Sequence, residues 1–318
     1  MERQSIVAKG LHESTRISDI DGLEVLRGGQ LPSPRAGDDR RLKLILDIFD
    51  VEHGACALIT TSGNKCIMVD CGDNTSTGWE PGTALLNRGI NALERLIVTN
   101  YDEDHASGFA NLYSRIAVFG LQRNANVSAQ LLYHLKSQDG IGGGVAGLAN
   151  TFSYFSGPAL PSVVDDITVT AFCNQPGVPP FGFNDENNLS LCVFVSCGLH
   201  RIVFPGDMEK AGWKALLANP LFVQQLNGVT LFIASHHGRE NGYCEEVLNL
   251  CPNIQAVIIS DKKKGHQSQE TVDRYRKYSR GFVYNGDNRH VLTTRRDGNM
   301  HFEIPSVGGA TVLLGMAA

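Results

Sequence analysis

The stretch Val98–Gly108, "VTNYDEDHASG", places three acids, Asp102 to Asp104, directly before His105. It follows the apolar letters "LIV" at 96–98, which are typical of a buried strand. Acids crowded at the end of a buried strand repel one another and lose hydration unless a positive charge lies among them. The following Ser and Gly favour a turn or a helix start. We therefore expect a turn that gathers these side chains around a positively charged group.

The same pattern recurs along the chain, where apolar strand-like runs end in acidic, amide or histidine side chains. Four runs end in "VDCGD" (Asp70, Asp73), "VTNYDEDH" (Asn100, Asp102, Asp104, His105), "FPGDME" (Asp207, Glu209) and "SHHG" (His236, His237), and a fifth follows "NDENNLS" at 184–190. Packed strands can bring such ligating groups together from distant parts of a sequence to build a rigid metal site. The motifs therefore predict a divalent metal site.

Short runs rich in β-branched residues alternate with helix-like segments in both halves of the chain. Strands are expected at 42–51, 56–61, 65–72, 95–100, 166–173, 189–197, 200–207, 228–238 and 254–261, with short strands near the C-terminus. Helices are expected at 81–90, 129–137, 208–217, 244–251 and 269–278. Two groups of strands with helices between them predict an α/β fold, in which two mixed sheets pack face to face with helices outside.

Two segments rich in glycine are expected to lie outside the regular elements, and the first of them marks the start of the predicted domain. Residues 1–40 end in "GGQLPSPRAGDDRR" and are expected to form an N-terminal arm or linker, followed by a single domain at 41–318. The segment "DGIGGGVAGLAN", 139–150, contains too much glycine for a regular element. We expect a surface loop there, with a lid over the site as the alternative.

The composition excludes several classes of protein. The chain has 318 residues, 42% of them apolar and 19% charged, as in an ordinary globular protein. Its formal net charge of −5 argues against a generally basic nucleic-acid wrapper. The N-terminus lacks a signal-peptide h-region, and no run of about 18 apolar residues predicts a membrane span. The eight cysteines form no CxxC pair and favour a reducing compartment, so we expect a cytoplasmic protein without a membrane partner.

The ordered series "DVEHGACAL", "IMVDCG", "VTNYDEDHASG", "NNLSL", "VFPGD" and "ASHHG" resembles the metallo-β-lactamase superfamily of metallohydrolases. Within it, the chain is most similar to soluble relatives of the hydrolase domain of ComEC competence proteins. The resemblance runs from about Leu42 to Tyr278. It implies a four-layer αββα metallo-β-lactamase sandwich and a metal-dependent hydrolase.

The resemblance also implies a ligand set. The family motif His-x-His-x-Asp-His falls on Asn100, Asp102, Asp104 and His105, so that Asn100 and Asp102 replace the histidines of the first metal position. The residues expected to bind metal are Asp102, Asp104, His105, Asp207 and His237. Oxygen ligands in place of imidazoles shift the preference from Zn²⁺ toward Mn²⁺ or Mg²⁺. One or two divalent ions are therefore expected, with Mn²⁺ or Zn²⁺ ahead of Mg²⁺.

The same resemblance suggests roles in catalysis. A bound divalent ion lowers the pKa of its water and generates a hydroxide that attacks phosphorus or a carbonyl carbon. Asp207, which bridges metals in relatives, is expected to do so here, Asp104 to orient the water or accept its proton, and His236 to face the substrate. The expected substrate-binding residues are Asn100, Asn187, Glu209, Arg239, Lys264 and His266. His53 is expected to be a hydrogen-bonded turn residue, with support of the ligands as the alternative, and Asp70 to be structural or to support the ligands rather than to bind metal directly.

Three functions remain open on the sequence. The leading expectation is hydrolysis of a phosphodiester, in nucleic acid or in a small nucleotide, and the negative net charge leans toward a small or single-stranded substrate. The second is an ester, lactone or thioester hydrolase that uses the same site. The third is a non-catalytic module with a degenerate metal site, whose arm at 1–40 would contact a protein partner.

Overall fold

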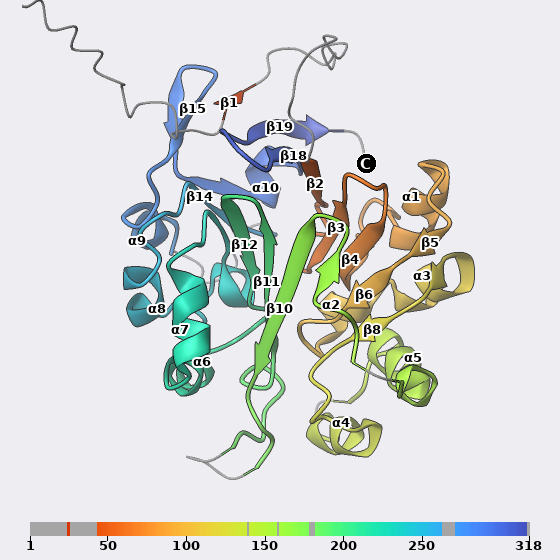
Figure 1. The fold of residues 1–318 in the computed structure, drawn as a ribbon. Helices are drawn as coiled ribbons and strands as arrows, with labels where there is room; N and C mark the ends of the chain where they lie inside the picture. The colour runs from red at the N-terminus through yellow and green to blue at the C-terminus, as the bar shows by residue number, and fades with distance from the viewer. Residues whose placement is uncertain are drawn as a thin grey trace, which may run out of the picture.

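The computed structural model describes residues 24–25, 43–138, 140–157, 159–177, 182–262 and 271–316. Of the predicted N-terminal arm, 1–40, it describes Glu24–Val25, which pairs with a C-terminal strand, and the rest lies outside the described residues. In the described part, two large mixed sheets face each other across the centre of the molecule (Figure 1).

Among the described residues, one sheet has eight strands and the other seven. The first contains, in spatial order, β1 (Glu24–Val25), β19 (Thr311–Met316), β18 (Asn299–Pro305), β2 (Lys43–Ile48), β3 (Cys56–Thr60), β4 (Cys66–Cys71), β6 (Arg95–Ile97) and β8 (Leu121–Gln122). The second contains β17 (Val291–Thr293), β14 (Ala256–Ile259), β13 (Leu231–Ile233), β12 (His200–Phe204), β11 (Leu191–Cys197), β10 (Ile167–Cys173) and β9 (Val163–Val164). Two small pairs join β15 (Phe282–Tyr284) to β16 (Asp287–Arg289) and β5 (Ala92–Leu93) to β7 (Ala117–Val118).

Helices cover the outer face of each sheet (Figure 1). On the first sheet lie α1 (Pro81–Asn87), α3 (Phe109–Arg115), α4 (Ala129–Leu135) and α5 (Gly143–Thr151), which continues into η1 (Phe152–Phe155). On the second lie α6 (Lys210–Leu217), α7 (Pro220–Leu226), α8 (Glu245–Asn249) and α9 (Val272–Arg276). Three short elements, α2 (Glu103–Ala106), η2 (Ser235–Gly238) and α10 (Thr294–Asp297), follow strand ends. The predicted four-layer αββα sandwich is confirmed.

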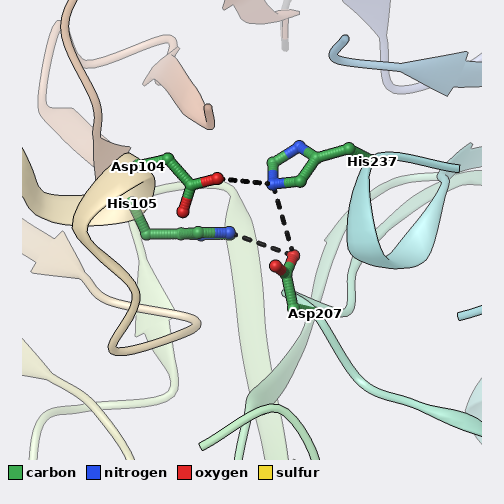
Figure 2. A group of neighbouring side chains, drawn as sticks. All are labelled: Asp104, His105, Asp207 and His237. Carbon is green, nitrogen blue, oxygen red and sulfur yellow. Dashed lines mark hydrogen bonds and ion pairs between the residues drawn. The ribbon is translucent and has the colours of Figure 1, made fainter. Parts of the chain in front are cut away.

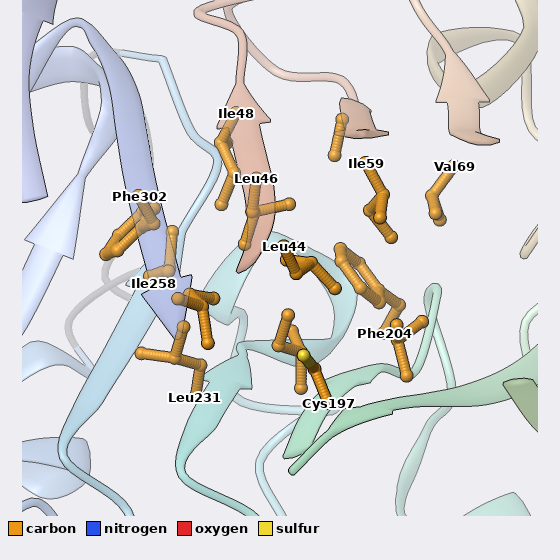
Figure 3. Packing of buried hydrophobic residues seen from close by; sticks show 14 of the residues in the cluster. Leu44, Leu46, Ile48, Ile59, Val69, Cys197, Phe204, Leu231, Ile258 and Phe302 are labelled. Atoms are coloured by element: carbon orange, nitrogen blue, oxygen red, sulfur yellow. The ribbon is translucent and has the colours of Figure 1, made fainter. Parts of the chain in front are cut away.

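The core between the sheets consists of aliphatic and aromatic side chains from both (Figure 3). Buried and half-buried residues alternate along β2, so that Leu44, Leu46 and Ile48 point inward against the second sheet. Phe204 of β12 and Ile258 of β14 meet them from the opposite side. Each such side chain contributes about 1.5–3 kcal/mol on burial. This shared core holds the two sheets, and therefore their strand ends, in a fixed relation.

The direction of the strands determines where the polar motifs gather. In the first sheet β4 and β6 run parallel, and in the second β12, β13 and β14 run parallel. Parallel neighbours end at the same edge of a sheet, which is where ligands bind in such folds. Asp70 lies at the end of β4, and Asp104, Asp207 and His237 follow β6, β12 and β13, so these side chains converge at one edge of the sandwich.

The prediction of a glycine-rich loop at 139–150 is wrong, because Gly143–Thr151 forms α5. The carboxylate of Glu103 accepts hydrogen bonds from the backbone N–H groups of Gly144 (2.7 Å) and Val145 (3.1 Å) and so caps the helix. A Cβ atom at Gly144 would lie 2.0 Å from the carbonyl oxygen of Ala106. Glycine is present here because two helices approach closely, and the capping carboxylate offsets its low helix propensity.

None of the helices in the described ranges combines the length and the apolar character that crossing a bilayer requires.

Candidate metal centre

Four predicted ligands form one compact group at the edge of the sandwich. Asp104 and His105 come from α2, Asp207 follows β12 and His237 lies in η2 (Figure 2). One ligand atom from each of the four lies within 4.8 Å of every other. The group joins both halves of the chain, since two of its members precede the glycine-rich segment and two follow it.

The ring of His105 is oriented by carboxylates on both sides. Its Nδ1 lies 2.9 Å from Oδ2 of Asp70, and its Nε2 lies 3.0 Å from Oδ1 of Asp207. Asp70 is itself held by the backbone N–H of Thr99 at 2.7 Å and by the Thr99 hydroxyl at 2.5 Å. A carboxylate that accepts a hydrogen bond from Nδ1–H keeps the proton on Nδ1 and leaves Nε2 to face the ligand group, as is usual for metal-binding histidines.

His237 is oriented in the same manner by a backbone carbonyl. Its Nδ1 donates to the carbonyl oxygen of Ser260 at 3.0 Å, which directs Nε2 toward the carboxylates. Nε2 lies 3.3 Å from Oδ2 of Asp104 and 3.6 Å from Oδ1 of Asp207. These are ion-pair distances, and neither Nε2 of His237 nor Oδ1 of Asp104 makes a hydrogen bond although both atoms are buried. Buried polar atoms without partners are costly, and a cation among them would satisfy both.

The backbone at the site is held in conformations that L-residues rarely adopt. Asp70, His236 and His237 have φ angles of 57°, 50° and 52°. Such left-handed conformations cost of order 1–3 kcal/mol each and persist where the surrounding structure imposes them, which is common at functional sites. Three such conformations lie at the edge of the sandwich that contains the site. The fold therefore places these side chains at the expense of local backbone stability.

Two glycines allow the backbone of α2 to approach its neighbours. A Cβ atom at Gly54 would lie 2.5 Å, and one at Gly72 2.4 Å, from the carbonyl oxygen of Asp104. The N–H of Ala55 donates to that oxygen at 3.2 Å. The loops after β2 and β4 therefore clamp the backbone of Asp104 directly, and no side chain at 54 or 72 would fit.

The charges within the group perturb one another strongly. Burial by itself would raise the pKa of Asp207, but the neighbouring His237 and His105 outweigh it and hold this pKa well below its usual range. Burial would lower the pKa of His105, but Asp207 and Asp70 hold it well above the ordinary value. The pKa of His237 is raised because Asp207 and Asp104 likewise outweigh its burial. The carboxylates and the imidazoles of the group therefore stabilise one another's charged forms.

The donor set fits a divalent metal ion. Two imidazoles and two carboxylates are ligands shared by Zn²⁺, Mn²⁺ and Fe²⁺ sites. Three members are almost fully buried, with exposed side-chain fractions of 2% for His105, 3% for His237 and 4% for Asp207, whereas Asp104 is 34% exposed. The group therefore has one open side, at Asp104.

His236, which was predicted to face the substrate, lies beside the four-residue group and contacts further polar residues. Its Nε2 is 3.8 Å from Oδ2 of Asp207, and its Nδ1 is 3.6 Å from Oε1 of Glu209 and makes no hydrogen bond. Arg239 donates to His236 Nε2 at 3.1 Å and to His53 Nε2 at 2.5 Å. Burial, with the charges of His237 and Arg239, lowers the pKa of His53 to about 4, so this ring is neutral at physiological pH.

The remaining predicted residues lie beside the four-residue group or outside the described chain. Asp102 is not one of the four, and its carboxylate pairs with Lys136. Asn100 donates to Oδ1 of Asn187 at 2.9 Å, and Asn187 donates to Glu209 at 3.4 Å. Lys264 and His266 lie outside the described residues.

Sequence reasoning missed Lys136 and Glu186, and it did not identify the contacts that His53 makes. The rings of His53 and His237 lie 4.6 Å apart, and Arg239 links His53 to His236. Lys136 binds both Asp102 and Glu186. A basic residue at the end of an amphipathic helix gives no local signal that its charge is directed inward, so no pattern in the sequence would have identified Lys136.

Solved structures of several proteins resemble the chain at low sequence identity. A diphosphatase of the PhnP family is 9% identical, with 83% of this chain and 98% of that chain covered and a TM-score of 0.41. Yeast PDE1 is 10% identical, with 78% of this chain and 98% of that chain covered and a TM-score of 0.42. The diiron β-hydroxylase CmlA of Streptomyces venezuelae is 12% identical, at 82% and 54% coverage and a TM-score of 0.43. No curated protein matches the sequence.

The family is identified by the sequence itself. The model of the metallo-beta-lactamase superfamily matches residues 49–243, more than half of the chain. The match includes the four-residue group, from the loop after β2 to the histidines that follow β13. Together with the two facing sheets, this match establishes that the chain belongs to the metallo-beta-lactamase superfamily.

Proposed function

We propose that this protein is a metal-dependent hydrolase whose divalent ion is held by Asp104, His105, Asp207 and His237. The observation that supports this most is the convergence of two imidazoles and two carboxylates, with Nε2 of His237 and Oδ1 of Asp104 left without hydrogen bonds. A divalent ion in such a site lowers the pKa of a water and polarises the bond under attack. We favour Mn²⁺ or Zn²⁺ over Mg²⁺, because Mg²⁺ prefers an oxygen-only environment.

The carboxylates of the group have different roles in this proposal. Asp207 is buried between His105 and His237 and serves as a ligand. Asp104 is the exposed member of the group, so its carboxylate can orient a water at the open side and accept a proton from it. Asp70 holds the proton on Nδ1 of His105 and keeps that ring directed toward the ligands.

The substrate that we favour is a phosphodiester. Arg239 lies against His236 and His53 at the site, and a guanidinium offers several N–H donors in a geometry that matches phosphate oxygens. Nδ1 of His236 has no hydrogen bond in the described structure and is a second candidate for contacting a substrate oxygen. The negative net charge of the chain favours a small nucleotide or a single strand over long duplex DNA.

Hydrolysis of two model substrates tests the proposal. The wild type, Asp104→Ala and Asp287→Ala are assayed on bis(p-nitrophenyl) phosphate and on p-nitrophenyl acetate, with and without added Mn²⁺. Asp287 is an exposed acid on β16 and serves as the matched control. We expect metal-dependent cleavage of the diester that falls by about 10²-fold or more in Asp104→Ala and persists in Asp287→Ala.

Each other outcome selects a different function. Cleavage of the acetate with no cleavage of the diester would retain the hydrolase and reject the phosphodiester. No cleavage of either substrate, with no effect of metal, would reject the enzyme and leave the partner-binding module.

We further propose that the chain acts in the cytoplasm as one domain that begins near residue 41. All eight cysteines are free, and seven of them are buried, which suits a reducing compartment. The sheet that contains β2 also contains the C-terminal strands β18 and β19, and all three contribute side chains to the core between the sheets.

A further inference from the structure

Lys136 directs a positive charge into the neighbourhood of the metal centre. It lies just after α4, and its ammonium binds Oδ1 of Asp102 and Oε1 of Glu186, the latter at 2.7 Å. Its side chain is only 9% exposed, whereas that of Lys214 in the surface pair Lys214–Glu246 is 63% exposed. A buried ammonium between two carboxylates is difficult to remove, because any ion pair that loses one partner leaves an uncompensated charge.

Asn100 completes the network between this lysine and Asp207. The backbone N–H of Asp102 donates to Oδ1 of Asn100 at 2.8 Å, which assigns the orientation of the amide. Its Nδ2 then donates to Asn187 at 2.9 Å and to Oγ of Ser190 at 3.1 Å. The same Ser190 oxygen accepts from the backbone N–H of Asp207 at 3.1 Å. The network therefore reaches the backbone of Asp207, and the side-chain amides of the network already form hydrogen bonds within it.

We infer that Lys136 takes the place of a second divalent ion, so that the centre binds one ion only, in the group of Asp104, His105, Asp207 and His237. The inference rests on the proposed function, because it assumes that this group binds an ion. Lys136 thus acts as a positioning residue that sets the metal stoichiometry and fixes Asp102 beside the site.

The available ligands explain why a second ion is excluded. A hard cation next to Asp207 would need oxygen ligands, and the network around Lys136 offers those of Asp102, Glu186, Asn100 and Asn187. Both carboxylates bind the ammonium of Lys136, which offsets one of their two negative charges, and the two amides bind each other. An incoming ion would have to displace a buried ammonium and leave it without a counter-charge, which opposes binding.

Metal stoichiometry measured by native mass spectrometry and by titration calorimetry with Mn²⁺ tests the inference. The wild type, Lys136→Met, Lys136→Arg and Lys214→Met are compared. Lys136→Arg keeps the charge, and Lys214→Met removes a lysine from a carboxylate pair on the surface. We expect one ion per chain in the wild type, Lys136→Arg and Lys214→Met, and a second, weaker ion in Lys136→Met, where Asp102 and Glu186 become available.

Two ions in the wild type, or one ion in a folded Lys136→Met, would overturn the inference and leave the proposed function intact. No ion in the wild type would overturn both. Circular dichroism reports whether each variant folds. If Lys136→Met does not fold, Lys136→Gln tests the same point, because glutamine is neutral and still donates hydrogen bonds to the carboxylates.

Discussion

A buried carboxylate behind His105 controls the direction of that ring without being one of the four ligands. Asp70 lies 2.9 Å from Nδ1 and is held by two hydrogen bonds from Thr99. We expect Asp70→Asn to weaken metal affinity by about 10–100-fold, because an amide no longer stabilises the required tautomer. Titration calorimetry with Mn²⁺ measures the change.

The neighbouring Asp73 provides the control for that variant. Its Oδ1 accepts a hydrogen bond from the Ser107 hydroxyl at 2.7 Å, its backbone N–H donates to Oγ of Ser107 at 3.0 Å, and it is not one of the four ligands. Asp73→Asn should keep the affinity of the wild type. Equal affinities for Asp70→Asn and the wild type would show that Asp70 does not orient His105.

The protonation state of the histidines makes metal binding depend on pH. The pKa values of His105 and His237 are raised by the carboxylates around them, so both rings tend to hold a proton that an ion must displace. Affinity for Mn²⁺ should therefore increase from about pH 6 to about pH 8, by roughly tenfold per pH unit for each proton released. Calorimetry in buffers of different ionisation enthalpy counts the protons, and an affinity that is constant over this range would contradict the account.

The site residues that could be predicted from the sequence lie at strand ends, whereas the one that could not depends on how a helix packs. Asp104, His105, Asp207 and His237 each follow an apolar run, and the ends of packed strands meet, so their grouping could be predicted. Lys136 lies at the end of α4 and is 34 positions from Asp102 in the sequence. A contact of that kind depends on how α4 packs, and no periodicity in the sequence specifies it.

At the scale of elements, α5 shows how packing overrides propensity. The composition of 139–150 predicts a loop, yet Gly143–Thr151 is helical because Glu103 caps its N-terminus and Gly144 admits the backbone of α2. Each predicted strand run contains a strand, because β-branched runs bounded by turns signal strands directly. The run 228–238 is strand only at Leu231–Ile233, and its histidines lie in η2. A helix made possible by a close contact has no such signal.

That contact can be tested with two glycines of the same helix. A Cβ atom at Gly144 would lie 2.0 Å from the carbonyl oxygen of Ala106, whereas one at Gly143 would have no heavy atom within 4 Å. Gly144→Ala should lower the free energy of unfolding by about 1–3 kcal/mol through overpacking. Gly143→Ala should leave it unchanged or raise it by up to about 1 kcal/mol, because alanine is the better helix former.

Denaturant unfolding of both variants measures these differences. A Gly144→Ala protein as stable as Gly143→Ala would show that α5 does not pack against α2 as described.

At the scale of the whole molecule, the metal centre joins the two halves of the sandwich. Asp104 and His105 follow a strand of the first sheet, whereas Asp207 and His237 follow strands of the second. An ion that binds the folded state alone should stabilise it by about 2.7 kcal/mol at a free concentration of 100 times Kd. Removal of metal by a chelator should therefore lower Tm, and added Mn²⁺ should restore it. A Tm that does not respond to either treatment would contradict a bound ion that links the sheets.

The central claim is that Asp104, His105, Asp207 and His237 together bind a divalent ion, and calorimetric titration of the metal-free protein tests it most directly. Wild type, Asp207→Asn and the exposed control Asp287→Asn are titrated with Mn²⁺ and with Zn²⁺ under the same conditions. We predict saturable binding to the wild type and to Asp287→Asn, with a loss of at least about tenfold in affinity for Asp207→Asn, which has lost the buried anionic ligand. Equal binding by wild type and Asp207→Asn, or no binding by the wild type, would contradict the account.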